Sequence, residues 1–305
     1  MSVRLGISPI GWSNDDMPEL GGATPLETCL ADARLAGFEG IELGHKFPRD
    51  PAVLRAILER HGLSLISGWY SGRLLERSVA EEIAAIENHR ALLAAMGCAV
   101  LVYAETTGSV AADRTRRLSS RPRLGAAEWR DLGGRLSEFA EQLSRRGIRL
   151  AYHHHMGTVV ENEAEIDRLM ASTGNSVTLL LDTGHLVFAG ADPARLARRY
   201  GPRINHVHCK DVRCDVLARI RAADASFLDA VLDGVFTVPG DGCVDFGELL
   251  AALAIVHYSG WLVVEAEQDP TKAPALAYAQ LGYAHLSAAA AHAGLVMSTA
   301  RGPGR

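Results

Sequence analysis

Four short polar segments decide how this sequence is interpreted: Tyr152-His153-His154-His155, Leu181-Asp182-Thr183-Gly184-His185, His206-Val207-His208-Cys209-Lys210-Asp211 and Val264-Glu265-Ala266-Glu267. Each segment ends an apolar run typical of a buried strand, at residues 148–151, 177–181, 204–207 and 262–264. The carboxyl ends of the strands of a parallel barrel meet at one rim, so the four segments are expected to lie together. Because imidazoles and carboxylates bind divalent metals, they predict one shared metal site.

Strands and helices alternate along the rest of the chain. Strands are expected at residues 3–7, 40–43, 63–68, 99–103, 149–153, 177–181, 205–209 and 261–265. Helices are expected at residues 25–36, 51–61, 79–96, 128–146, 193–200, 246–256 and 274–291, with Asp50 as an N-cap and Gly147 as a C-cap. This alternation predicts an α/β protein, a parallel eight-stranded (β/α)8 TIM barrel with its helices outside.

The chain is long enough for one such domain, expected at residues 1–298 of the 305. Two segments interrupt the alternation, at residues 106–127 and 213–245, and both follow strands. They are therefore rim insertions, with use as lids or as subunit contacts both open. The polar run 13–18 is a further loop at this rim that could cover the site, and residues 299–305 are expected to be a disordered tail.

Composition excludes several kinds of partner. The formal net charge is -5 and the basic residues are dispersed, which argues against nucleic acid and anionic membranes. No window has the length and hydropathy of a membrane span or signal peptide, so we expect a soluble, cytoplasmic protein with a small-molecule partner. The five cysteines form no paired motif and are expected to be free thiols, with Cys209 or Cys214 as an alternative thiolate ligand. The sequence leaves a homo-oligomer open.

Strand periodicity sorts the histidines by face. Residues two apart on a strand share a face, so His153 and His155 project together and His154 projects oppositely, while His206 and His208 share a face. The alternative for any one histidine is a hydrogen-bonded place in the core. For Asp182 the alternative is a helix cap.

Further polar and aromatic residues follow the strands and complete the rim. Trp12 and Trp69 offer an aromatic wall for a ring-shaped substrate, although packing under a loop is an equal alternative. The alternative to a functional role is an ion pair with Asp211 for Lys210 and a solvated position for Glu267. The candidate substrate-binding residues are Trp12, Asn14, Glu42, Lys46, Trp69, Glu105, His155 and Lys210.

These motifs also resemble a known family. The segments at 182–185, 206–211 and 263–265 resemble the xylose isomerase-like superfamily of metal-dependent sugar isomerases, epimerases and dehydratases. Longer strings at 11–22, 40–51, 67–72 and 152–158 are similar to the inosose dehydratases of myo-inositol catabolism, and the similarity extends to about Asp269.

The resemblance implies a metal set of His153, Asp182, His208 and Glu265. His153 stands where the superfamily usually has glutamate, which leaves His155 or Glu161 as alternatives for that ligand. An epimerase of this kind uses two carboxylates, whereas a dehydratase needs one base and one acid. The replacement of a carboxylate by imidazole therefore favours a dehydratase.

The expected activity is metal-dependent removal of water from 2-keto-myo-inositol, giving a trihydroxycyclohexane-1,2-dione. Mn²⁺ or Co²⁺ is the expected metal, Glu265 the base and His185 or His153 the acid, with Lys210 and Glu42 holding hydroxyls. Glutathione accompanies this activity in the family, but no segment of the sequence indicates where it would bind. The alternatives are a sugar or keto-inositol isomerase or epimerase, a 3-dehydroshikimate-type dehydratase, and a non-catalytic polyol-binding barrel.

Overall fold

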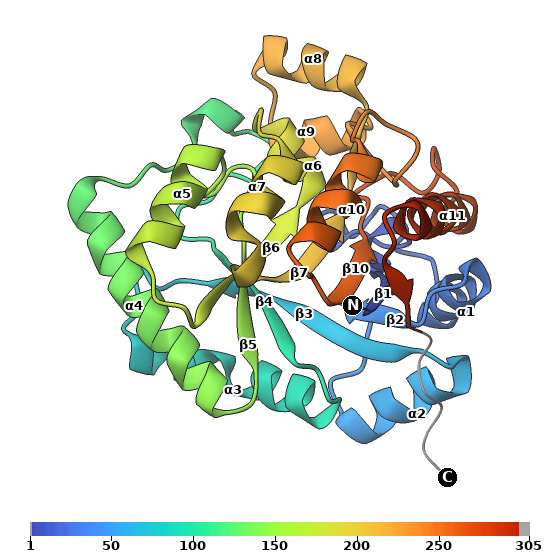
Figure 1. The fold of residues 1–305 in the computed structure, drawn as a ribbon, viewed down its shortest axis with the longest axis horizontal. Helices are drawn as coiled ribbons and strands as arrows, with labels where there is room; N and C mark the ends of the chain where they lie inside the picture. The colour runs from blue at the N-terminus through green and yellow to red at the C-terminus, as the bar shows by residue number, and fades with distance from the viewer. Residues whose placement is uncertain (1, 299–305) are drawn as a thin grey trace.

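The computed structural model describes residues 2–298, and the predicted disordered tail at 299–305 lies outside them. Eight parallel strands in this part of the chain close into a barrel (Figure 1). They are β1 (Ser2–Ile7), β2 (Gly40–Leu43), β3 (Ser64–Gly72), β4 (Val100–Glu105), β5 (Arg149–His153), β6 (Val177–Asp182), β7 (Ile204–Cys209) and β10 (Gly260–Val264). Pairing of β10 with β1 closes the ring, so the predicted TIM barrel is confirmed.

Helices surround the strands in Figure 1. They are α1 (Leu26–Ala36), α2 (Pro51–His61), α3 (Val79–Ala95), α4 (Ala126–Arg145), α5 (Glu163–Ser172), α6 (Thr183–Phe188), α7 (Pro193–Tyr200), α10 (Phe246–Ile255) and α11 (Ala275–His292). The Asp50 side chain accepts from the backbone N–H groups of Ala52 and Val53 and so caps α2, as predicted. Gly147 follows the cap residue of α4 with φ of +82°, a conformation that glycine adopts without strain. No helix of the described residues has the length and apolar content needed to cross a membrane.

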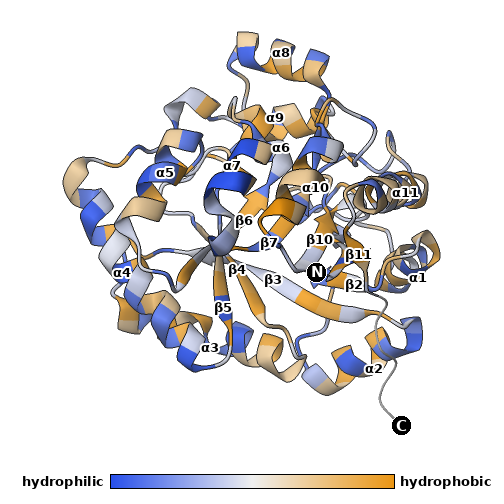
Figure 2. Ribbon diagram, in the orientation of Figure 1, coloured by the Kyte–Doolittle hydropathy of each residue, from blue (hydrophilic) through white to orange (hydrophobic). Residues whose placement is uncertain are grey.

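The core has an outer and an inner part. Figure 2 shows hydrophobic residues along β3, β4 and β6, while the surrounding helices mix hydrophobic and hydrophilic positions. Leu150, Tyr152 and Leu181 belong to the large cluster between strands and helices. Ala151 and Leu180 point the other way and form a separate apolar cluster with strand β4. His153 and Asp182 follow these two residues by two positions, so strand alternation places them on the same inner face.

Several elements were not expected from the sequence. Strand β3 continues to Gly72, and the segment between β5 and β6 contains α5. The insertion at 213–245 holds α8 (Cys214–Ala223), α9 (Phe227–Leu232) and β9 (Phe236–Thr237), and β9 pairs antiparallel with β8 (Asp211–Val212), which immediately precedes the insertion. The remaining short elements are the 3-10 helices η1 (Pro9–Gly11), η2 (Leu118–Ser120) and η3 (Gly201–Arg203) and the edge strand β11 (Val296–Met297).

The prediction that all cysteines are free was wrong for one pair. Cys214 and Cys243 form a disulfide across 29 residues of sequence. Antiparallel pairing of β8 with β9 folds the insertion back on itself, and the Cys243 N–H donates to the carbonyl of Val212. This places the two cysteines side by side, which sequence spacing alone does not indicate. The other three cysteines are free and buried.

Candidate metal centre and its cavity

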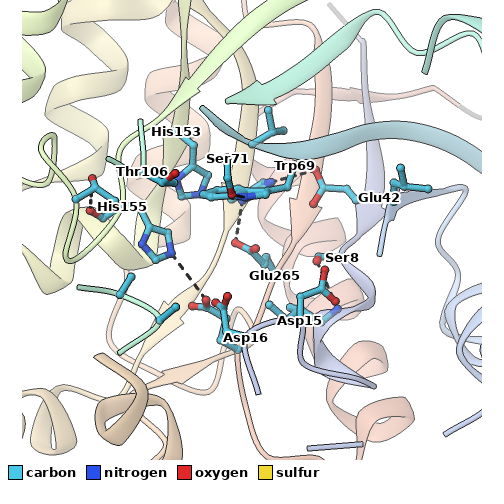
Figure 3. A pocket seen from close by; sticks show the side chains of 18 of the residues that line it. Ser8, Asp15, Asp16, Glu42, Trp69, Ser71, Thr106, His153, His155 and Glu265 are labelled. Carbon is cyan, nitrogen blue, oxygen red and sulfur yellow. Dashed lines mark hydrogen bonds and ion pairs between the residues drawn. The ribbon is translucent and has the colours of Figure 1, made fainter. Parts of the chain in front are cut away.

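A cavity of about 370 Å³ opens at the carboxyl ends of the strands. That volume lies within the range of small-molecule sites. Figure 3 shows Glu42, Trp69, His153, His155 and Glu265 around it. Glu42, Trp69 and His153 lie in β2, β3 and β5, while His155 and Glu265 follow β5 and β10. The ends of these strands therefore meet at one rim, as the four segments predicted.

The four predicted ligands lie together on one side of the cavity. One donor atom from each of His153, Asp182, His208 and Glu265 lies within 4.8 Å of the others. Asp182 Oδ2 is 3.4 Å from His153 Nε2 and 3.5 Å from His208 Nδ1. His208 Nδ1 is 2.8 Å from Glu265 Oε2. The four segments therefore meet at one rim as their places at strand ends predicted, and the residues that converge are those implied by the resemblance to the superfamily.

Three of these donor atoms fit a metal because they converge without aligned hydrogen bonds. Asp182 Oδ2, His208 Nδ1 and Glu265 Oε2 are buried and have no aligned hydrogen-bond partner among the described residues. Buried polar atoms normally have such partners, whereas these three have charge contacts with one another and with Lys210. A divalent cation bound by two imidazoles and two carboxylates would satisfy all three, and this donor set suits Mn, Co, Fe or Zn.

The two alternatives to His153 as a metal ligand, Glu161 and His155, lie outside this donor group. Glu161 accepts from the Gly157 N–H and forms an ion pair with Arg121. His155 belongs to a second group, with His185 and Glu267. His153 is therefore the residue that geometry selects for the first ligand position.

Asp182 caps a helix with one carboxyl oxygen and turns the other toward the donor group. Its Oδ1 accepts from the His185 N–H and caps α6, while Oδ2 faces His153 and His208. The pKa of Asp182 would be raised by burial, but Lys210 and His185 hold it well below its usual value. The carboxyl is thus ionised and placed by the helix that it caps.

Glu42 orients His208 from outside the donor group. Glu42 Oε1 accepts from Ser67 Oγ at 2.5 Å and lies 3.0 Å from His206 Nε2 and 3.1 Å from His208 Nε2. With its Nε2 proton on Glu42, His208 presents Nδ1 to the donor group. Burial lowers the pKa of His208, but Glu265 and Glu42 outweigh it and hold the pKa well above its usual value. The same negative surroundings favour a bound cation.

Lys210 forms a second cluster directly behind the first. Its Nζ is fully buried, 2.8 Å from Glu267 Oε2, 3.1 Å from Glu265 Oε2 and 3.1 Å from His185 Nε2. Burial opposes its charge, but the carboxylates of Glu265, Glu267 and Asp182 raise the pKa of Lys210. Lys210 is therefore a buried ammonium that does not line the cavity, unlike the substrate-binding role expected for it.

The structural alternatives considered for Lys210 and for Glu267 do not hold. Asp211 does not pair with Lys210 but accepts backbone N–H groups of Gly240, Gly242 and Val244, which fixes the insertion to the barrel. Glu267 is not solvated, since only 3% of it is exposed. Folding of the insertion over this end of the barrel, which the local sequence does not reveal, explains both differences.

His155 and His185 differ in their distance from the cavity. His155 lines the cavity, with Nδ1 donating to the Met156 carbonyl and Nε2 3.9 Å from Glu267 Oε1. His185 lies behind it, at 4.0 Å between ring centroids, and is fully buried outside the lining residues. Burial and Lys210 hold the pKa of His185 well below its usual value. The structure therefore does not place His185 where the expected acid would meet a substrate.

Trp69 forms one wall of the cavity, as predicted. Its ring lies edge-on to His153 and His155, at centroid distances of 5.3 and 5.7 Å, and it is 40% exposed. The indole N–H donates to Ser71 Oγ, which holds the ring in place. A flat aromatic surface beside the donor group suits the C–H face of a cyclic polyol.

Four other expected substrate-binding residues, Trp12, Asn14, Lys46 and Glu105, do not line this cavity. Trp12 donates to Asp32, and Asn14 accepts from two N–H groups of its own loop. Lys46 donates to three backbone carbonyls of the same loop. Glu105 accepts from the Leu74 N–H and the Tyr103 hydroxyl. Other parts of the protein satisfy these side chains, so their places at strand ends did not make them part of the cavity.

Other residues in the cavity wall were missed as individual candidates. Asp15 and Asp16 reach the cavity beside Glu265 in Figure 3, from the polar run that was expected to cover the site. That expectation about the loop was correct. The remaining polar residues that were missed are Ser8, Ser71, Thr106, Thr158 and Ser109.

Comparisons with known proteins agree with this geometry. The family model of the xylose isomerase-like TIM barrel matches residues 30–288. The rhizopine catabolism protein MocC of Rhizobium meliloti is 52% identical over 300 residues, covering 98% of this chain and 92% of the relative. An inosose dehydratase of Geobacillus thermodenitrificans is 45% identical over 279 residues, covering 91% and 94%.

The solved structure of an L-ribulose 3-epimerase shares the fold, with a TM-score of 0.70 at 18% identity and 96% of each chain covered. The resemblance inferred from the motifs is thus confirmed, and the identity to inosose dehydratases supports an enzyme of the dehydratase class. The chain belongs to the xylose isomerase-like TIM-barrel family, within which its sequence is similar to the inosose dehydratases and to MocC.

Proposed function

We propose that this protein is a metal-dependent dehydratase that removes water from 2-keto-myo-inositol and forms a trihydroxycyclohexane-1,2-dione. The observation that carries the proposal is the convergence of donor atoms from His153, Asp182, His208 and Glu265, three of them without an aligned hydrogen bond to the described residues, next to a cavity of small-molecule size. The likeness to inosose dehydratases supports the substrate class. The aromatic wall at Trp69 and the polar lining suit a cyclic polyol ketone.

The donor group of His153, Asp182, His208 and Glu265 would hold Mn²⁺ or Co²⁺. When bound, the metal supplies positive charge beside the ketone oxygen, which becomes negative as the α proton leaves. Glu265 directs Oε2 to the donor group, while its Oε1 makes no hydrogen bond or ion pair with the described residues. That second oxygen is the proposed base for the α proton.

The residue at position 153 supports dehydration over epimerisation. An epimerase removes a proton with one carboxylate and returns it with another, whereas here an imidazole replaces the first carboxylate of the ligand set. Glu265 is then the one carboxylate that belongs to the donor group and also lines the cavity. One base beside the ketone is what dehydration requires.

The test is to follow 2-keto-myo-inositol by NMR in deuterated water, with the metal-loaded protein, with and without glutathione. The expected result is loss of water and formation of the dione. Recovery of deuterated or epimerised inosose without dione would favour the epimerase. Binding without any exchange or conversion would favour a polyol-binding barrel, and turnover of 3-dehydroshikimate in its place would favour the other dehydratase.

A further inference from the structure

One carboxyl group in the cavity has no place in the ligand set. Asp16 lies on the loop between β1 and α1 and lines the cavity together with Glu265, His155 and Glu267 (Figure 3). Its exposed surface faces the cavity, while surrounding protein atoms desolvate its carboxyl from the other sides. Its backbone N–H donates to Asn14 Oδ1, but its carboxyl oxygens make no hydrogen bond with the described residues.

The loop that carries Asp16 is anchored on both sides. Asn14 accepts from the N–H groups of residues 16 and 17, which forms a tight turn immediately around Asp16. Lys46 donates to the carbonyls of Gly21, Gly22 and Thr24, at 3.1, 2.9 and 2.6 Å. His45 Nδ1 lies 2.5 Å from Asp15 Oδ1, so the neighbouring carboxyl is tied to the end of β2. These contacts hold Asp16 in place without using its side chain.

The surroundings of Asp16 raise the pKa of its carboxyl. Desolvation by the cavity wall is the largest cause, Glu267 and Asp15 raise the pKa further, and His155 and Lys210 act in the opposite direction. Two other cavity groups have partners: His155 Nδ1 donates to the Met156 carbonyl and its Nε2 faces Glu267 Oε1 at 3.9 Å, while Glu267 accepts from Lys210. A carboxyl with a raised pKa and with oxygens that no described residue binds is suited to donate a proton.

We propose that Asp16 is a further catalytic residue, the general acid that protonates the departing hydroxyl. This assignment rests on the proposed dehydration. The α C–H bond breaks, its proton passes to Glu265, and its electron pair forms the enolate. The carbonyl then re-forms, a double bond forms between the α and β carbons, and the β carbon–oxygen bond breaks.

The departing oxygen takes the proton of Asp16 and leaves as water, so Asp16 becomes a carboxylate. The enol that remains rearranges to the dione. Solvent then reprotonates Asp16 and accepts the proton from Glu265, so the cycle needs no oxidant or reductant.

The experiment compares Asp16→Asn with Glu19→Gln, a matched control at an exposed position of the same loop that does not line the cavity. Two substrates are used: 2-keto-myo-inositol, and its analogue with fluorine in place of the departing hydroxyl. Fluoride leaves without taking a proton. Metal content and α-proton exchange in deuterated water are measured for each protein.

Asp16→Asn should lose about 10²–10⁴-fold in the rate of water loss, the usual contribution of general acid catalysis. It should keep its metal, its α-proton exchange and its rate of fluoride loss, while Glu19→Gln behaves as the unmodified protein in every assay. Unchanged water loss in Asp16→Asn would overturn the assignment. An equal loss with both substrates would also overturn it, since that outcome indicates a structural role.

Failure of the proposed function has a different signature. In that case the unmodified protein forms no dione from the inosose, and the assignment of Asp16 falls with it. The product of the unmodified protein therefore separates a wrong acid from a wrong reaction, and the fluoride assay separates an acid from a structural residue.

Discussion

Two clusters of ionisable side chains lie next to each other at the same end of the barrel, and they differ in how their negative charge is balanced. In the cluster around Lys210, a buried ammonium lies among its partners and contacts Glu267 and His185. In the cluster of His153, Asp182, His208 and Glu265, the same ammonium lies to one side, 3.1 Å from Glu265 Oε2 and 3.7 Å from Asp182 Oδ2, and three donor atoms make no aligned hydrogen bond with the described residues. Cluster composition alone does not distinguish a metal site from a structural ion network, but the position of the internal cation relative to the donor atoms does.

This comparison predicts that removal of metal has the largest effect on activity. Chelator-treated protein should lose dehydration completely and regain it with Mn²⁺ or Co²⁺, because no side chain replaces the missing positive charge beside the ketone. Activity is measured together with elemental analysis. Full turnover by a preparation shown to be metal-free would remove the distinction between the two clusters.

Two adjacent histidines test the face assignment. His153→Ala should weaken metal binding by more than the roughly 10–100-fold typical of losing an outer partner, because it removes a donor. His154 is fully buried and its Nε2 accepts from the Asp182 N–H, so His154→Ala is the matched control and should mainly lower the free energy of unfolding. Metal titration and urea unfolding of both variants provide the readout. Equal metal affinity of the two variants would show that His153 is not a metal ligand.

Removing the internal cation should destabilise the fold. Lys210→Met leaves Glu267 and Glu265 buried without their ammonium partner, and breaking a buried pair in this way costs about 3–5 kcal/mol. Urea unfolding of the metal-free protein measures this cost apart from any contribution of the metal. The exposed Lys272, which donates only to the Leu232 carbonyl, provides the control as Lys272→Met. Equal free energies of unfolding for the two variants would show that the Lys210 ammonium does not stabilise the carboxylates of Glu267 and Glu265.

The smallest expected effect concerns the orientation of His208. Glu42→Gln keeps the size of the side chain but weakens its hold on the His208 Nε2 proton, so metal affinity should fall by about 10–100-fold. Competition with a coloured chelator measures this change. Ser67→Ala, which removes only a hydroxyl donor to Glu42, should have less effect, and the reverse order would show that Glu42 does not act through His208.

The fold was accessible from the sequence because it depends on short-range periodicity, and the same strand order predicted that the four polar segments meet at one rim. Alternation sorted only the histidines by face, and the choice of His153, Asp182, His208 and Glu265 came from the resemblance to the superfamily. The paths of the loops were not accessible. Lys46 binds carbonyls 22 to 25 residues away, so its contacts depend on the folded path of the β1–α1 loop, which no local pattern encodes.

The same reason explains the other differences between expectation and structure. Lys210 follows β7 with the residue spacing of a rim residue, but the insertion covers it, and Phe236 lies 4.7 Å from its ammonium between nitrogen and ring centroid. The disulfide joins the two ends of that insertion. Asp16 belongs to a run recognised only as a loop, because polar composition does not say which of its carboxyls turns inward.

The two carboxyl oxygens of Asp182 make different contacts, and this restricts the substitutions that the position tolerates. One oxygen begins α6 and the other faces the donor group. Asparagine can keep the cap but replaces one oxygen with an amide nitrogen, and glutamate is longer by one methylene group and changes both distances. Neutral drift at this position is therefore expected to be rarer than at a residue that only caps a helix or only binds an ion.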